Sequence, residues 1–180
     1  MPAEKIAAPP LLDDETLAFA ARIFGYARQG RAEELAELFG QGLPANLRND
    51  KGDSLLMLAA YHGHEAATRV ILEAGGDPGL ANDRGQSPFA GACFKGETGI
   101  ARLLIAHGAG VEGEADGTRT PLMVAAMFDR TEIVAMLLAS GADPAKRDAS
   151  GLTAADIARS MGAARTPAQL DAAERSEAGG

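Results

Sequence analysis

A period of 33 residues runs through most of the chain and constrains its fold more than any other feature. Three columns of the sequence step at this period: one of glycines, one of hydroxyl residues and one of residue types suited to turns. The columns are Gly42, Gly75, Gly108 and Gly141; Ser54, Ser87, Thr120 and Thr153; and Gly30, Gly63, Gly96, Asp129 and Gly162. Because independent columns share one period, the sequence predicts a stack of small, similar units whose cores are shared with their neighbours.

Each unit has the pattern of two short antiparallel helices followed by a turn-rich link. Ser87-Pro88 and Thr120-Pro121 place a hydroxyl at the N-cap and a proline at the first helical position, where a missing N–H is tolerated. The first helix is expected to end at a turn residue such as Gly96. The second helix has an apolar run such as Val70-Ile71-Leu72, and Gly75 follows it where a left-handed residue is expected.

Several short motifs recur at this period. They are Thr120–Met123 (TPLM), the pairs Ala59-Ala60 and Ala125-Ala126, Gly63-His64, Leu137-Leu138 and Gly141–Asp143. Together they resemble the ankyrin repeat over roughly residues 17–161. The resemblance implies an all-α solenoid of stacked helix–turn–helix units with short β-hairpin-like loops, comprising three full repeats and degenerate capping repeats at both ends. It also implies a concave groove lined by the hairpin tips and the first helices.

The columns also set the expected boundaries. We expect a single domain over 13–174, with units at about 13–48, 49–81, 82–114, 115–147 and 148–174, between flexible tails at 1–12 and 175–180. The fifth unit becomes polar around Ala154–Ala158, which indicates a C-terminal cap, because a terminal unit needs a wettable outer face. A short helix at about 167–174 would complete that cap. The turn tip at 116–118 lacks a glycine at position 118, so we expect that hairpin to be misshapen or mobile.

Composition and charge exclude several classes of function. The chain has 17 Lys and Arg residues against 25 Asp and Glu, and a net charge of −8 disfavours binding to nucleic acid or to an anionic membrane. No apolar run approaches the ~18–20 residues that span a bilayer, and the N-terminal segment does not resemble a secretory signal. The single cysteine, Cys93, excludes an internal disulfide. We therefore expect a cytoplasmic monomer, and the heavy use of Ala, Gly and Arg suggests a bacterial gene.

The resemblance assigns partner binding to the columns that face the groove. These columns hold a large share of the aromatic residues, which make up only 4% of the chain, and exposed apolar groups rimmed by charge usually mark a protein-binding site. The candidates on the first helices are Tyr61, His62, Phe94, Lys95, Met127 and Phe128, and those at the turn tips are Lys51, Asp53, Arg84, Gln86 and Arg119. An alternative remains open, in which the aromatic side chains fold against the hairpins and only thicken the layer.

These features predict a non-catalytic protein that binds a protein partner through the groove and needs no cofactor. One form of this function is an immunity- or chaperone-like protein that blocks or protects a specific enzyme. A metal-dependent protein or enzyme would use His62 and His64, but a metal site needs three or four converging ligands, and His64 occupies the Gly-His position of the motif. A nucleic-acid adaptor is disfavoured because the sequence shows no stripe of Lys and Arg. Cys93 falls in the alanine column, which predicts burial rather than a nucleophilic role.

Overall fold

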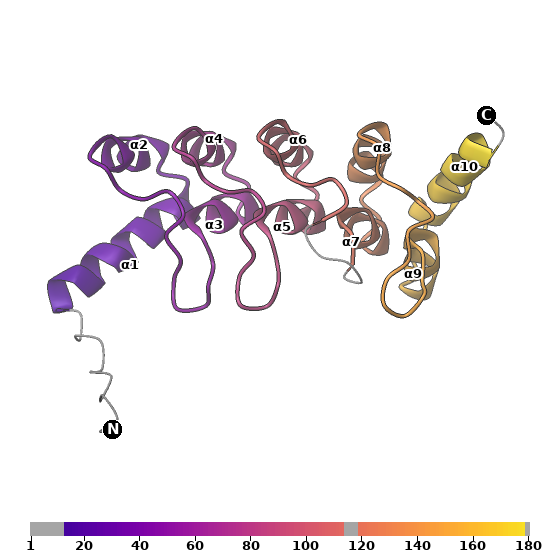
Figure 1. The fold of residues 1–180 in the computed structure, drawn as a ribbon, viewed down its shortest axis with the longest axis horizontal. Helices are drawn as coiled ribbons and strands as arrows, with labels where there is room; N and C mark the ends of the chain where they lie inside the picture. Colours follow the sequence, from indigo (N-terminus) through magenta and orange to yellow (C-terminus); the bar gives the residue numbers. More distant parts are fainter. Residues whose placement is uncertain (1–12, 114–118, 179–180) are drawn as a thin grey trace, which may run out of the picture.

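The computed structural model describes residues 13–113 and 119–178, and this part of the chain forms ten helices and no strand (Figure 1). The helices pair into five consecutive units, α1 with α2, α3 with α4, α5 with α6, α7 with α8, and α9 with α10. Their bounds are α1 Asp14–Gln29, α2 Ala32–Gly40, α3 Leu55–Tyr61, α4 Glu65–Glu73, α5 Pro88–Lys95, α6 Thr98–Ala106, α7 Pro121–Met127, α8 Thr131–Ala139, α9 Ala154–Ser160 and α10 Thr166–Ala178.

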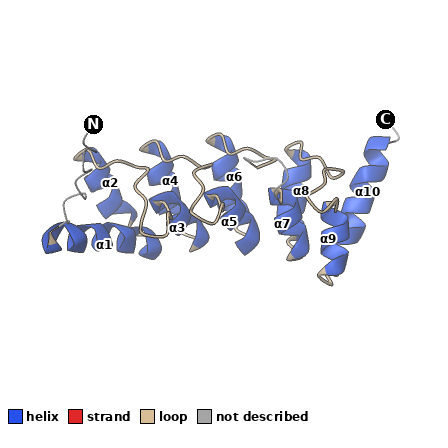
Figure 2. Cartoon of the chain, turned by 60° about the horizontal axis from the view of Figure 1, so that its bottom comes forward, coloured by secondary structure: helices blue, strands red, loops and turns tan. Residues whose placement is uncertain are grey.

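The units stack side by side in two helical layers. The first helices α3, α5, α7 and α9 contact one another in sequence and form the lower row of Figure 1, while α2, α4, α6 and α8 form the upper row. Figure 2 shows the same arrangement from a second direction, with helices connected only by loops in the described residues. The architecture is the predicted all-α solenoid.

The hydroxyl column forms the helix N-caps that its position predicted. The side chains of Ser54, Ser87, Thr120 and Thr153 accept hydrogen bonds from the backbone N–H three residues later, at 3.0–3.3 Å. Each bond satisfies one of the amide donors that a helix start leaves unpaired. The caps fix where each first helix begins, so they keep successive units in the same register.

The links between units are hairpin-like loops closed by paired backbone hydrogen bonds. In the loop between α2 and α3, the Asn49 N–H donates to the Asp53 carbonyl, and the Gly52 N–H donates to the Asn49 carbonyl. The same pair of bonds recurs from Asn82 in the next loop and from Asp148 in the loop before α9. The predicted tip at 116–118 lies outside the described residues, as does the predicted N-terminal tail at 1–12.

Small side chains allow the layers to approach closely. The alanine pairs of the first helices are buried, and Cys93 takes the place of an alanine in the third unit with no exposed surface. Burial raises the pKa of the Cys93 thiol to about 12, so the thiol stays protonated near neutral pH. This agrees with the predicted structural role of that position.

The C-terminal end of the fold differs from the expected boundary. Helix α10 continues past residue 174 to Ala178, so it is longer than the short helix expected at about 167–174. The reason lies in the sequence, because no glycine or proline interrupts residues 175–178 before Gly179. The longer helix contacts α7, α8 and α9 and covers the end of the stack.

Gly75 follows α4 with a φ of +91°, in the left-handed region that its column predicted. A Cβ at this position would meet no atom within 4 Å, so substitution strains only the backbone. We expect Gly75→Val to lower the free energy of unfolding by at least ~1 kcal/mol, measured by urea denaturation. Gly75→Asn is the matched control and should cost less, because asparagine tolerates this conformation better. Equal losses in both variants would contradict the backbone explanation.

Candidate functional site

Three aromatic side chains form a row along the C-terminal ends of α3, α5 and α7. This aromatic row consists of Tyr61, Phe94 and Phe128. The rings of Tyr61 and Phe94 are nearly parallel, with centroids 6.2 Å apart and an interplanar angle of 7°. The rings of Phe94 and Phe128 meet edge to face at 4.6 Å and 81°. Because each ring comes from a different unit, the row exists only when the units are stacked.

The aromatic row is accessible to solvent. Tyr61 and Phe128 expose 38% and 37% of their surface, and Phe94 between them is half-buried. The rings contact one another and are not sealed beneath the hairpins. A contiguous apolar surface of this kind is typical of a docking site.

Two polar side chains from the predicted set flank Tyr61. The Lys95 ammonium nitrogen lies 5.2 Å from the Tyr61 ring centroid, a cation–π geometry, and the His62 ring meets the Tyr61 ring edge-on at 5.6 Å. The pKa of His62 is lowered, first by its partial burial and then by electrostatic interactions with the nearby His64, Arg28 and Lys95 side chains. The imidazole is therefore mainly neutral near pH 7.

Met127 and Arg119 add a second contact beside the row. Arg119 Nη1 lies 3.8 Å from the Met127 sulfur, and Met127 directly precedes Phe128 in the chain. Met127 is half-buried and packs against the core, whereas Arg119 is exposed. The structure thus brings together seven of the predicted residues: Tyr61, His62, Phe94, Lys95, Arg119, Met127 and Phe128.

The other predicted residues lie at the hairpin tips, where hydrogen bonds join one tip to the next. The Asn82 amide donates to the Asp53 carboxylate at 2.7 Å and to the Gln86 side-chain oxygen at 3.2 Å. The first of these bonds links the tips of two successive hairpins. Asp53 therefore helps to join successive hairpins, and Gln86 helps to shape its own tip. All four tip residues, Lys51, Asp53, Arg84 and Gln86, remain candidates for contact with a partner.

His64 joins the first two units. Its Nε2 lies 2.8 Å from the Arg28 carbonyl oxygen, and its ring packs against Gly30, where a Cβ would lie only 2.6 Å from the ring. The rings of His62 and His64 are stacked at 6.4 Å. Across residues 13–113 and 119–178, no three His, Cys, Asp or Glu side chains gather in a metal-binding arrangement. The contacts of His64 are those of a structural residue.

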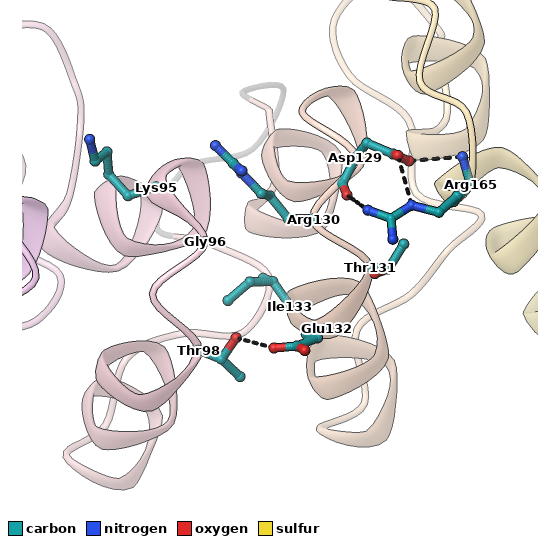
Figure 3. Close-up of a pocket in the computed structure, with 9 residues that line it drawn as sticks. All are labelled: Lys95, Gly96, Thr98, Asp129, Arg130, Thr131, Glu132, Ile133 and Arg165. Carbon is teal, nitrogen blue, oxygen red and sulfur yellow. Dashed lines mark hydrogen bonds and ion pairs between the residues drawn. The ribbon is translucent and has the colours of Figure 1, made fainter.

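A shallow hollow of about 240 Å³ lies at the turns of the third to fifth units (Figure 3). The Asp129 carboxylate at its rim accepts hydrogen bonds from the backbone N–H groups of Arg165 and Thr166, both at 2.9 Å, and from Arg165 Nε at 3.1 Å. The buried Thr166 hydroxyl donates to the Ala126 carbonyl at 2.8 Å. These hydrogen bonds join the fifth unit to the fourth. The residues on this side of the hollow therefore have a structural role.

The bonds to Asp129 predict a dependence of stability on pH. The backbone N–H groups of Thr166 and Arg165 lower the pKa of Asp129 from 3.8 to about 2. A lowered pKa in the folded state stabilises the protein fully above the unfolded value, and this stability is lost as the pH falls from about 4 to about 2. We expect Asp129→Asn, which keeps a residue tolerant of the positive φ of 55°, to remove this pH dependence.

The measurement is amide hydrogen exchange of α9 and α10 as the pH is lowered, corrected for intrinsic exchange rates. Wild type should lose protection in this window, whereas the Asn variant should be less protected at pH 7 and change less on acidification. An identical pH profile in both proteins would contradict this assignment.

Two residues of this region were not singled out from the sequence. Arg130 Nε donates to the Phe94 carbonyl at 3.2 Å, which links the aromatic row to the next unit. Arg130 lies two periods after His64 in the sequence. Each of the two side chains contacts the backbone carbonyl of a residue 36 positions before it. The column of residues following the turn glycine is the signal that could have revealed Arg130. Arg165 lies outside that column, and its role follows only from the fold.

Comparison with known proteins agrees with the repeat pattern. A family model for ankyrin repeats, in three copies, matches residues 56–148. A Pseudomonas aeruginosa protein named for its ankyrin repeats, PA3287, is 57% identical to this chain over 61 residues. That similarity covers 34% of this chain and 36% of the relative, so the match spans about a third of the curated protein. No helix in the described residues is long and apolar enough to cross a membrane.

Proposed function

Since this chain belongs to the ankyrin-repeat family, whose repeats generally mediate protein–protein interaction, we propose that it binds one protein partner through the aromatic row. The proposed protein is non-catalytic and monomeric, and acts on its partner by steric contact. The observation that supports this most strongly is the row itself, with rings from three units in mutual contact and exposed at both ends.

The positions of these rings favour a binding role over a purely structural one. The buried alanine pairs and leucines already supply the core of each unit, so the stack does not require large apolar groups at the ends of the first helices. Aromatic side chains provide a large contact area at a small cost in side-chain entropy, and they are enriched among residues that dominate binding energy. Exposed Lys51, Arg84 and Arg119 would supply polar contacts at the rim.

The proposed setting is the cytoplasm of a bacterium. The unpaired Cys93 is buried within the third unit, which suits a reducing compartment, and the similar PA3287 protein is bacterial. An immunity- or chaperone-like role is one version of the proposal, in which the partner is an enzyme. That version requires the partner's activity or stability to change when the two proteins are mixed.

The test is affinity capture from a lysate of the source organism, with wild type and the double variant Tyr61→Ala/Phe94→Ala side by side. Phe19→Ala is the matched control, because Phe19 on α1 is 37% exposed, like Phe128, and lies outside the row. A partner captured by wild type and by Phe19→Ala but lost by the double variant supports the proposal. A partner captured equally by all three overturns the assignment to the aromatic row.

A further inference from the structure

Four exposed basic side chains lie near the aromatic row of this acidic protein. We call Arg28, Lys95, Arg119 and Arg130 the basic edge; all four side chains are exposed. Among the second helices, α2 and α4 carry more acidic than basic residues, with Glu33, Glu34, Glu37, Glu65 and Glu73 against Arg69, whereas α6 carries Arg102 and no acidic residue. The net charge of −8 therefore leaves room for a local excess of basic side chains beside the aromatic row.

Three members of the basic edge contact the row or its neighbours directly. Lys95 lies over the Tyr61 ring at 5.2 Å, Arg119 contacts the Met127 sulfur at 3.8 Å, and Arg130 binds the Phe94 carbonyl at 3.2 Å. In Figure 3, the Lys95 and Arg130 side chains both point away from the hydrogen bond between Thr98 and Glu132.

Arg28 extends the basic edge toward the N-terminus. It occupies the position in the first unit that Tyr61 occupies in the second, one period later. The Arg28 carbonyl oxygen lies 2.8 Å from His64 Nε2. The positive charge of the Arg28 side chain helps to lower the pKa of His62, which lies beside Tyr61. The edge therefore spans the first four units.

Two carboxylates in this part of the described structure, those of Glu97 and Asp129, have other contacts. Glu97 is half-buried and packs over Gly63, and Asp129 is bonded to Arg165 and Thr166. None of the ion pairs between described residues involves a member of the basic edge. The cations are thus placed to meet carboxylates from outside the molecule.

We infer that the partner presents an acidic segment to this surface, with an apolar side chain against the aromatic row and carboxylates against the basic edge. The inference rests on the proposed function and specifies the chemistry of the partner. At physiological ionic strength, charges are screened beyond roughly 8–10 Å, so the cations in contact with the segment outweigh the distant glutamates. The complementary charges would speed association and select against basic partners.

The experiment selects peptides of about a dozen residues from a random phage-displayed library on the purified full chain. Parallel selections use the row variant Tyr61→Ala/Phe94→Ala/Phe128→Ala and the charge-reversed variant Lys95→Glu/Arg130→Glu. Arg102→Glu on α6 is the control, because Arg102 is exposed and lies on a second helix. Circular dichroism first verifies that all variants keep the helical content of wild type.

Wild type and Arg102→Glu should enrich acidic peptides that contain an apolar residue, and the charge-reversed variant should lose them in favour of basic peptides. An enriched acidic peptide should bind the charge-reversed variant at least about tenfold more weakly. Three outcomes would overturn the proposed acidic segment: enrichment of basic peptides on wild type, enrichment of peptides of the same charge on wild type and the charge-reversed variant, or no enrichment at all. In each case the proposed function would still be tested separately, by the capture from the lysate.

Two further outcomes distinguish the alternatives. Equal enrichment of the same peptides on wild type and on the row variant would count against the proposed function itself. A labelled single-stranded oligonucleotide that binds wild type, and is lost by the charge-reversed variant, would assign the basic edge to nucleic acid and overturn the acidic segment.

Discussion

Phe94→Ala is expected to weaken the complex with the captured partner by about 30-fold, equivalent to ~2 kcal/mol of binding free energy. Phe94 is the central ring of the aromatic row and contacts both Tyr61 and Phe128. Truncation removes its own contact area and separates the two outer rings, so the loss should exceed that of either outer ring alone. Titration calorimetry with the purified partner measures the change.

A loss of binding is informative only if the stack remains folded. Phe94 is half-buried at the end of α5, whereas Phe89 on the same helix is 2% exposed, so Phe89→Ala is the comparison for a core ring. We expect Phe94→Ala to change the melting temperature much less than Phe89→Ala, and Tyr61→Ala to change it little. A Phe94→Ala protein that melts like Phe89→Ala would identify that ring as a core residue.

Leu104→Ala is expected to lower the free energy of unfolding by ~2–5 kcal/mol, the range for leucine truncation in a packed core. Leu104 has no exposed surface and lies on α6, which packs against α4, α5 and α8. A cavity here weakens the third unit and both of its interfaces. In a linear stack each interface contributes separately, so the loss should uncouple the two halves of the protein.

Urea denaturation followed by circular dichroism measures both effects. Wild type should unfold in one transition, and Leu104→Ala should unfold earlier and over a broader range. The control is Arg102→Ala on the same helix, which is exposed and should change stability by less than about 0.5 kcal/mol. A Leu104→Ala protein as stable as this control would contradict a core shared between units.

The repeated local features of the fold were predictable from residue types and their spacing. Serine or threonine followed by an apolar run specifies an N-cap wherever it occurs, and Ser54 and Thr120 form such caps. The glycine at position 75 likewise predicted a backbone with positive φ there. The position of Cys93 in the alanine column predicted that its side chain is buried. Each of these properties depends on neighbours within one unit or on the strict period.

Departures from the period were less predictable. Asp129 replaces a turn glycine, and its carboxylate binds Arg165 and Thr166 in a joint that no repeated motif encodes. The tip residues Asp53 and Gln86 were predicted as partner-binding residues, and only the structure shows that both also accept hydrogen bonds from Asn82. An exposed polar column has the same sequence pattern whether its side chains bind a partner or each other.

The order of the units, their helical class and the residues that start and end the first helices were determined by the sequence alone, because short-range sterics and backbone hydrogen bonding act within a few residues. Only the tertiary structure decided that Tyr61, Phe94 and Phe128 touch ring to ring. It also decided that Lys95 lies over the Tyr61 ring and that Arg130 donates to the Phe94 carbonyl. Such contacts depend on the stacking geometry of neighbouring units and on side-chain rotamers, which the spacing of residues along the chain does not specify.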